Sequence, residues 1–166
     1  MRQKAWFFLL TGLIFVSVSV AAQTIRNPRL NASDLEAATA AAKSAQGPDA
    51  ELVYATRADA IEKGKLNCLV VVSAATAGKA KAYVVQVIRD GNALKLVADE
   101  SGNALPSGDR FLKIGLRHEN GKAPLLRVMS ATRETGSSEE RQRNLDFQYK
   151  GTEFTLVGQS VTSMAK

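Results

Sequence analysis

His118 is the only histidine among the 166 residues, and imidazole is the side chain most often used as a general base. With Glu119 it begins the His-Glu-x-x-His pattern of zinc peptidases, but the second histidine is replaced by Lys122. A serine hydrolase would need a Gly-x-Ser-x-Gly turn for its nucleophile, and the chain contains none. We therefore predict no catalytic residue set built on this histidine.

Paired carboxylates are a second route to chemistry, since two Asp or Glu side chains can hydrolyse a glycosidic bond. Asp59 and Glu62 lie on one expected loop, and Asp99 and Glu100 lie beside an expected turn. Charged turns are common on protein surfaces, so neither pair alone indicates an acid and a base. The pairs keep one alternative open, a hydrolase acting on envelope material. A pocket that gathers these acids with His118 would favour it.

Cys68 is the only cysteine. One cysteine makes no intramolecular disulfide, so the fold must be stabilised by packing of its core. The residue lies within an apolar run, where a free thiol behaves as a small hydrophobic group and not as a nucleophile. We predict a buried, inert thiol, and we expect no cofactor.

The first 22 residues have the features of a secretory signal peptide. Arg2 and Lys4 form a basic start, an apolar run covers Ala5–Val20, and small residues end the segment at Val20-Ala21-Ala22. The run is short for a membrane-spanning helix, and no second apolar run follows. We therefore expect an exported mature chain, periplasmic or extracellular, without a membrane span.

The mature chain has a modest positive charge. Removing Arg2 and Lys4 lowers the net charge from +6 to +4, and the basic residues of the second half are spread along the sequence. Nucleic-acid binding needs a concentrated basic patch with aromatic rings among the charges, so we predict no nucleic-acid partner. Weak attraction to anionic polysaccharide or lipid remains open.

A short run of sequence occurs twice and organises the chain. Residues 62–74 and 119–131 are identical at seven positions with a constant offset of 57. The identical pairs are Glu62/Glu119, Gly64/Gly121, Lys65/Lys122, Leu69/Leu126, Val71/Val128, Ser73/Ser130 and Ala74/Ala131. Related pairs are Tyr54/Phe111 upstream and, at an offset of 60, Gly91/Gly151, Leu94/Phe154, Leu96/Leu156 and Val97/Val157. Self-similarity of this kind predicts two structural units of one type.

A helix is expected before the repeats. Ser33 and Glu36 match the capping box that begins many helices, and Gly47-Pro48 ends the helical pattern. Alanine predominates between these limits, and large apolar side chains are few. We therefore expect the helix to pack lightly on a sheet or to cover a sheet edge.

Each repeat predicts four strands. Those of the first unit are Glu51–Thr56, Leu66–Ala74, Ala82–Arg89 and Ala93–Ala98, and those of the second are Arg110–Leu116, Leu125–Ala131, Asn144–Tyr149 and Glu153–Gly158. Asp90-Gly91-Asn92 and Lys150-Gly151-Thr152 are typical hairpin turns. The predicted organisation is a signal peptide (1–22), a leader with the helix (23–49), a first unit (50–100), a linker (101–109), a second unit (110–159) with a charged loop at Arg133–Arg143, and a tail (160–166).

Strand alternation assigns the shared residues to one face of each unit. Leu69, Val71 and Ser73 point to one side of their strand, and all three recur in the second repeat. On the other side, the position of Val70 in the first repeat is occupied by Arg127 in the second. A charge in a closed core is costly unless it is paired. We expect both units to bury the shared face in the same way, with the other face partly open in the second unit.

Four antiparallel strands per unit, a period just under sixty and a glycine loop after the first strand resemble the FG-GAP and VCBS blade repeats of integrin-α-type β-propellers. The resemblance covers residues 51–159. It implies a calcium loop of alternating acids, for which Asp59 would be the first ligand and Asn67 the last. Ile61 and Lys63 occupy the middle ligand positions, and the second unit has Leu116, His118, Asn120 and Pro124 at the four positions. We therefore predict no bound metal.

Two units cannot close a ring of blades, so we predict a mainly β fold in which two four-stranded antiparallel units pack as a compact pair beside a short helix. The alternatives are a single antiparallel sheet of the α+β class and assembly into a larger ring by homo-oligomerisation. The function we expect is an exported, non-enzymatic module that binds a protein or a glycan or acts as a scaffold. The candidate binding loops contain Glu62, Lys65, His118, Glu119 and Lys122, and an aromatic and apolar strip at 145–149 and Phe154 is a further candidate face.

Overall fold

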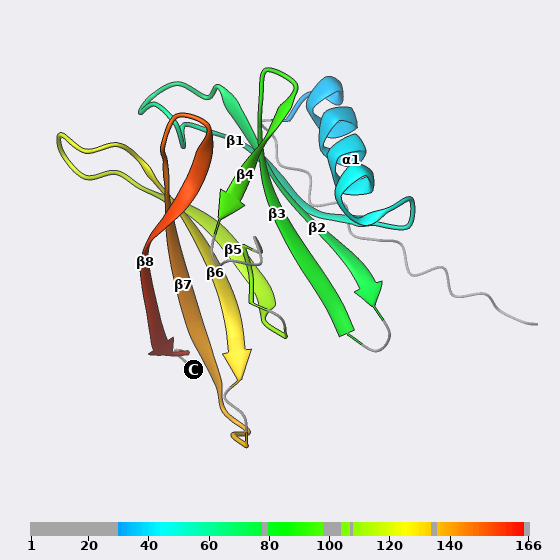
Figure 1. Ribbon diagram of the computed structural model, residues 1–166, viewed down its shortest axis with the longest axis vertical. Coiled ribbons are helices and arrows are strands. Elements are labelled where there is room, and N and C mark those ends of the chain that lie inside the picture. Colours follow the sequence, from blue (N-terminus) through cyan, green and yellow to red (C-terminus); the bar gives the residue numbers. More distant parts are fainter. Residues whose placement is uncertain (1–29, 78–79, 98–103, 107, 134–135, 165–166) are drawn as a thin grey trace, which may run out of the picture.

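The computed structural model describes residues 30–77, 80–97, 104–106, 108–133 and 136–164. The predicted signal peptide, the leader up to Arg29, and the acids Asp99 and Glu100 lie outside the described residues. One helix precedes eight strands (Figure 1). Their bounds are α1 Ala32–Gln46, β1 Glu51–Ala58, β2 Cys68–Ala77, β3 Ala80–Arg89, β4 Asn92–Val97, β5 Arg110–Arg117, β6 Leu125–Arg133, β7 Glu140–Tyr149 and β8 Glu153–Ser163.

The strands form two antiparallel four-stranded meanders, as the repeat predicts, in the order β1-β2-β3-β4-β8-β7-β6-β5. β4 joins the two meanders. It pairs with β3 at Asn92–Leu94 and then runs parallel to β8 from Lys95 to Val97. The predicted mainly β fold with two units and a short helix is therefore confirmed, and a strand that passes from one sheet to the other connects the units.

Two predicted boundaries differ most from the structure. β7 begins at Glu140, so the last part of the predicted charged loop, from Glu140 to Arg143, belongs to a strand and the loop is shorter than expected. β8 continues to Ser163, past the predicted end at Gly158. In both cases polar residues extend a strand because the neighbouring strand supplies backbone partners: β6 pairs with β7 as far as Glu140, and β7 pairs with β8 as far as Ser163.

The larger of two hydrophobic clusters among the described residues lies between the two meanders. Both units contribute buried residues to it: Ala58, Ala60, Cys68, Val70, Val72, Val85, Val87, Leu96, Ala104, Leu105, Leu126, Val128, Leu145, Phe147 and Phe154. The Cys68 thiol is buried here and contacts the carbonyl oxygen of Ala58 at 3.1 Å, and burial raises the pKa of this thiol. Phe147 and Phe154, from the aromatic strip of the sequence, are fully buried, so they serve the core and not a binding face.

The shared residues of the repeat lie on opposite sides of the sheet in the two units. Leu69 and Val71 face α1 and pack with Ala38, whereas Leu126 and Val128 face the common core. The expectation that both units bury this face in the same way is therefore wrong. The register of strand pairing explains the difference. In the second unit, Phe147 pairs with Leu126. In the first unit, Val87 is the counterpart of Phe147 at the offset of 60, but it pairs with Val70, one residue beyond Leu69, which is the counterpart of Leu126. A shift of one residue turns every side chain of a strand to the other face.

The helix α1 covers the outer side of β1, β2 and β3 (Figure 1). Its buried apolar contacts are made by Ala38 and Ala42, so the helix packs on the sheet with little apolar area, as expected. It begins two residues earlier than predicted: Asn31 is the N-cap and Asp34 completes the capping box, in place of Ser33 and Glu36. Gly47 ends the helix as predicted.

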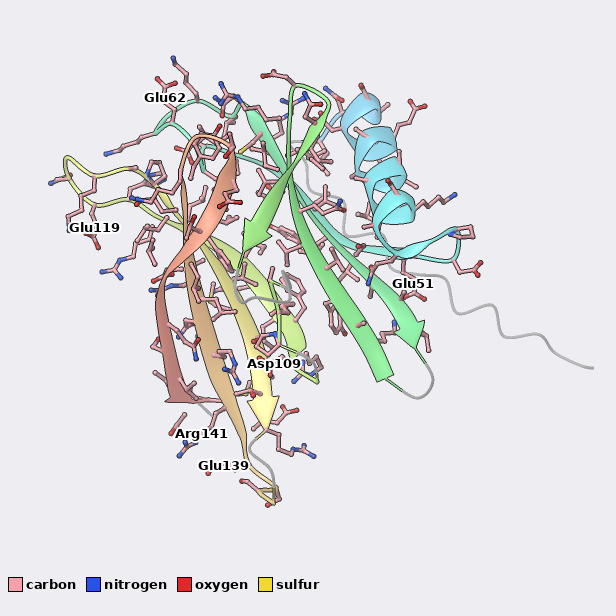
Figure 2. The ribbon with its side chains drawn as sticks, in the orientation of Figure 1. Glu51, Glu62, Asp109, Glu119, Glu139 and Arg141 are labelled. Carbon is pink, nitrogen blue, oxygen red and sulfur yellow. The ribbon has the colours of Figure 1, made fainter. Side chains whose placement is uncertain are left out.

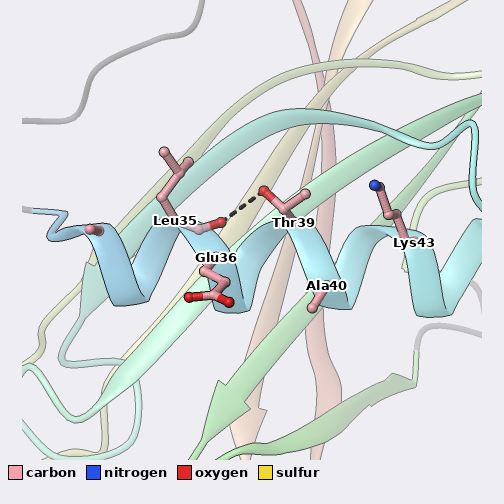
Figure 3. Close-up of a pocket in the computed structure, with 6 residues that line it drawn as sticks. Leu35, Glu36, Thr39, Ala40 and Lys43 are labelled. Carbon is pink, nitrogen blue, oxygen red and sulfur yellow. Dashed lines mark hydrogen bonds between the residues drawn. The ribbon is translucent and has the colours of Figure 1, made fainter.

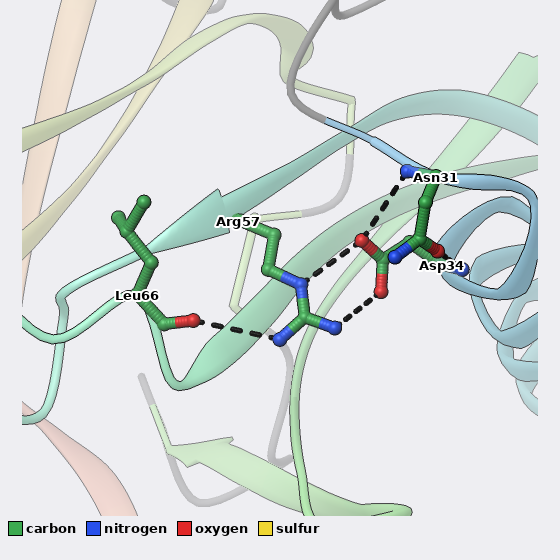
Figure 4. A network of polar contacts seen from close by, with 4 residues as sticks. All are labelled: Asn31, Asp34, Arg57 and Leu66. Carbon is green, nitrogen blue, oxygen red and sulfur yellow. Dashed lines mark hydrogen bonds and ion pairs between the residues drawn. The ribbon is translucent and has the colours of Figure 1, made fainter.

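An ion pair explains the choice of this cap (Figure 4). The Asn31 side chain accepts a hydrogen bond from the Asp34 backbone N–H at 2.8 Å. Arg57 of β1 donates through Nε to the Asp34 carboxylate at 2.9 Å, and Asp34 is almost fully buried. The Arg57 guanidinium therefore lowers the pKa of the Asp34 carboxyl, and Asp34 in turn raises the pKa of Arg57. The cap thus also fixes the helix to the sheet.

Arg127 lies on the outer side of the second unit, and its charge is paired. Its guanidinium binds the Asp146 carboxylate through Nε at 2.6 Å and through Nη2 at 2.7 Å. This bidentate ion pair offsets the free-energy cost of half-burying the Arg127 charge, and it raises the pKa of Arg127. No helix within the described residues is long and apolar enough to cross a membrane.

Candidate functional site

The repeated Glu-x-Gly-Lys sequence forms the same turn in both units. The backbone N–H of Lys65 donates to the Glu62 carbonyl at 3.1 Å, and the N–H of Lys122 donates to the Glu119 carbonyl at 3.2 Å. The glycine in third position has a positive φ in each turn, 83° at Gly64 and 72° at Gly121, as a type II turn requires. The shared turn conformation therefore explains why the glycine is identical in the two repeats.

The charged side chains of these turns pair within their own turn. Lys65 binds Glu62 at 2.8 Å, and Lys122 binds Glu119 at 2.7 Å. Lys122 lowers the pKa of the Glu119 carboxyl. Figure 2 shows Glu62 and Glu119 on separate turns at the same end of the molecule. Four of the candidate binding residues thus lie together at this end, with their charges largely neutralised by one another.

His118 links the two repeated loops. Its Nε2 lies 3.4 Å from Oδ1 of Asp59 in the loop between β1 and β2. The other oxygen of Asp59 accepts a hydrogen bond from the Gly64 N–H at 2.8 Å. Within the described residues no serine hydroxyl or cysteine thiol is hydrogen-bonded to His118. The histidine and Asp59 therefore connect the two repeated loops.

In the loop that resembles a calcium site, the two remaining ligand candidates differ in their hydrogen bonding. Asp59 binds the backbone of Gly64, and the Asn67 side-chain oxygen is buried without a partner among the described residues. Across the described ranges, no three His, Cys, Asp or Glu side chains are grouped so that they could hold a metal ion. The resemblance to calcium-binding blades stays a prediction.

A shallow hollow lies along the outward side of α1 (Figure 3). Among the described residues, its lining comes from the helix: Ala32, Leu35, Glu36, Thr39, Ala40 and Lys43. The Thr39 hydroxyl donates to the Leu35 carbonyl at 2.8 Å and so turns its polar group back to the helix. The described part of the chain therefore supplies one wall of this hollow, which does not by itself enclose a ligand.

A second region lies where the two units meet, and we call it the seam. It contains three half-buried aromatic rings, Tyr54 of β1, Tyr83 of β3 and Phe111 of β5. The Phe111 ring centroid is 6.2 Å from that of Tyr54 and 6.3 Å from that of Tyr83. Residues of both units therefore form one aromatic cluster whose rings remain partly exposed.

A buried polar network adjoins the aromatic cluster. Asp109, directly before β5, accepts hydrogen bonds from the Ser130 hydroxyl at 2.8 Å and from Nε of Arg143 at 2.8 Å. Nη2 of Arg143 donates to the Thr132 hydroxyl at 3.0 Å. Ser130 is the register partner of both Phe111 and Arg143, so the network continues the row that begins with the ring. Figure 2 places Asp109 between the two sheets.

The network leaves donor capacity unused. Arg143 has five N–H donors, and its Nη1 group has no partner among the described residues. Its side chain is 22% exposed, whereas that of Asp109 is 5% exposed. The buried acid therefore holds Arg143 in place, while the Arg143 side chain remains partly exposed.

Compared with protein-family models, with curated proteins and with solved structures, the chain has no significant match. The seam residues Asp109, Ser130 and Arg143 were not among the sites predicted from the sequence. One signal in the sequence pointed to this region, the match of Tyr54 with Phe111 across the repeat. It did not show that the two rings would touch.

Proposed function

We propose that the mature chain is an exported, non-enzymatic binding module and that its ligand binds at the seam. The observation that supports this proposal is a cluster of three half-buried rings in the same sheet row as an arginine with unused donors, since Phe111 and Arg143 are both register partners of Ser130. Ligand sites combine apolar surface with a few fixed polar groups, and they often occur where two structural units meet. The seam has these properties, whereas the charges of the repeated turns are neutralised locally.

The chemistry of the seam fits a glycan better than a peptide strand. A sugar ring presents a face of C–H groups, which can lie on an aromatic ring, and a rim of hydroxyls, which can accept from Arg143. The positive net charge favours an anionic glycan of the envelope or of the cell exterior. A polypeptide ligand is the other outcome that the experiment can reveal.

The test uses residues 23–166 on an array of bacterial and host glycans, followed by calorimetric titration of the best oligosaccharide. Tyr54→Phe and Tyr83→Phe keep the rings, and we expect each to weaken binding at least threefold when a hydroxyl contacts the ligand. Arg143→Lys keeps the charge and should weaken binding about tenfold. The matched control is Tyr149→Phe, which removes a hydroxyl from the ring pair with Phe154, outside the seam.

Equal binding by the wild type and the seam variants would place the ligand elsewhere. Binding to a polypeptide and to no glycan would correct the ligand class. The alternative function, an envelope hydrolase with a carboxylate pair, predicts release of reducing ends from envelope polysaccharide. Release that Asp59→Asn or Glu62→Gln abolishes would replace the binding module by an enzyme.

A further inference from the structure

Strand β8 has an unpaired edge over most of its length. The strand has 11 residues, and β7 pairs with one edge from Phe154 to Ser163. β4 pairs with the other edge at Glu153–Thr155 only. Beyond Thr155, no strand within the described residues lies on that side. In Figure 1 this C-terminal half of β8 is the outermost strand on its side of the molecule.

The free edge has a β-bulge at Val157, where the register with β7 shifts, but it lacks charged residues and proline, which also prevent strand pairing. Between Phe154 and Met164 the sequence has no Asp, Glu, Lys, Arg or Pro. Val157 is 48% exposed and Val161 is 42% exposed, and the residues between and after them are mainly small or polar. An exposed strand edge without charge or proline is a template for another strand.

The other open edges of this fold are protected. β1 and β5, the outer strands of the sheet, each have a β-bulge near the start, which distorts an edge against pairing. They also carry charged residues, Glu51 and Arg57 on β1 and Arg110, Lys113 and Arg117 on β5. On β3 the unpaired part of the edge carries the exposed Lys81. β8 also has a bulge, but among these edges it is the one without a charged residue on its unpaired part.

We propose that two copies of this chain associate through their β8 edges, as antiparallel strands over Leu156–Thr162. An antiparallel pair of identical strands is self-complementary about a two-fold axis, so a second copy supplies a matching edge. Both copies carry a positive net charge, and the uncharged β8 edge lets them approach without opposed charges at the contact. The second unit of each copy would then form half of a continuous intermolecular sheet.

The sequence of the edge indicates a register. With the two-fold axis at Gln159, Val157 lies opposite the partner subunit's Val161, and the reverse pair forms as well. Both exposed valines then gain cross-strand partners. A contact of one strand on each side buries less than the roughly 1,200 Å² of a stable interface, so we expect a reversible dimer with micromolar affinity.

Sedimentation equilibrium of residues 23–166 over a range of micromolar concentrations tests this proposal. We expect an average mass that rises with concentration from one chain towards two. The variant Gln159→Lys/Thr162→Lys places two lysines on the β8 edge of each copy, and the lysines at position 159 face each other at the two-fold axis. The dissociation constant of the dimer should therefore rise at least tenfold. Both positions are exposed, and circular dichroism checks that the fold is kept.

The matched control is Ala37→Lys/Ala40→Lys, which adds the same charge on the exposed side of α1 and should leave the dissociation constant unchanged. A monomer at all concentrations would overturn the proposal. So would a dimer that the edge lysines leave intact, or one that both variants weaken equally. Under oxidation the Gln159→Cys variant should form a dimer linked by a disulfide between the two copies of position 159. Cys68 is buried and does not compete for this disulfide. Dimers without that cross-link would refute the register centred on Gln159.

Discussion

Tyr54 and Phe111, which match across the two repeats, are in contact with ring centroids 6.2 Å apart and ring planes at 46°. The first ring comes from β1 and the second from β5, so equivalent residues of the two repeats contact each other at the seam. Because the core beside them takes residues from both units, neither meander buries its apolar face alone. We therefore expect the units to fold as one cooperative domain.

Phe111→Ala should lower the free energy of unfolding by about 2 kcal/mol, because a half-buried ring loses its contacts with two tyrosines. Urea unfolding followed by circular dichroism and by tyrosine fluorescence measures it, and both probes should report a single transition. Phe111→Tyr gives the second repeat the ring of the first and should change stability by less than about 0.5 kcal/mol. Two separate transitions in the wild type would contradict the common core.

Asn31→Ala should cost about 1 kcal/mol, because the first turn of α1 loses the side chain that accepts from the Asp34 N–H. Ser33→Ala is the matched control, since Ser33 is exposed inside the first turn and is not the cap. It should change the free energy of unfolding by less than about 0.5 kcal/mol. Thermal and urea unfolding of both variants compare the two positions directly. A larger loss for Ser33→Ala would restore the cap predicted from the sequence.

The pKa of Asp34 gives stability a specific pH dependence. Arg57 lowers this pKa in the folded state, whereas the unfolded chain has a value of about 3.9. The contribution is therefore complete above the unfolded pKa and is lost as pH falls through the folded-state pKa. At neutral pH, Asp34→Asn should cost about 1.5–3 kcal/mol, as loss of a hydrogen bond to a charged group does.

Urea midpoints of the wild type and of Asp34→Asn, measured from about pH 7 to about pH 3, test the sign. The difference between the two proteins should shrink at the acid end, because Asp34 becomes protonated in the wild type and loses its charged pair, whereas other carboxylates titrate in both proteins and cancel. Glu36→Gln serves as the control, since Glu36 is exposed on the same helix. A difference that stays constant down to the lowest pH would mean that the Arg57 pair does not depend on the Asp34 charge.

Gly64→Ala and Gly121→Ala should each cost about 1 kcal/mol, because alanine disfavours the positive φ of 83° and 72° at these positions. The surroundings of both glycines are open, so the cost comes from the backbone conformation and not from a clash. Equal effects in the two units are expected, since the turns are equivalent. Thermal unfolding of the two single variants measures them, and an unchanged midpoint would refute the turn assignment.

The sequence by itself determined the local elements. Strand alternation, turn glycines and the repeat specified two meanders of four strands, and the alanine-rich segment specified a helix ended by Gly47. These features depend on neighbours within a few residues, where backbone conformation and side-chain alternation are fixed by residue type. The choice of Asn31 over Ser33 was beyond such reasoning, because Arg57 lies 23 residues from Asp34 along the chain.

Only the tertiary structure decided which faces meet. The identical residues Leu69 and Leu126 turn to opposite sides because strand register differs by one residue between the units, and register is a property of pairing between strands. The seam has the same origin. Tyr54, Tyr83, Asp109 and Arg143 come from segments far apart in sequence, and the crossing of β4 from β3 to β8 sets how the two units face each other.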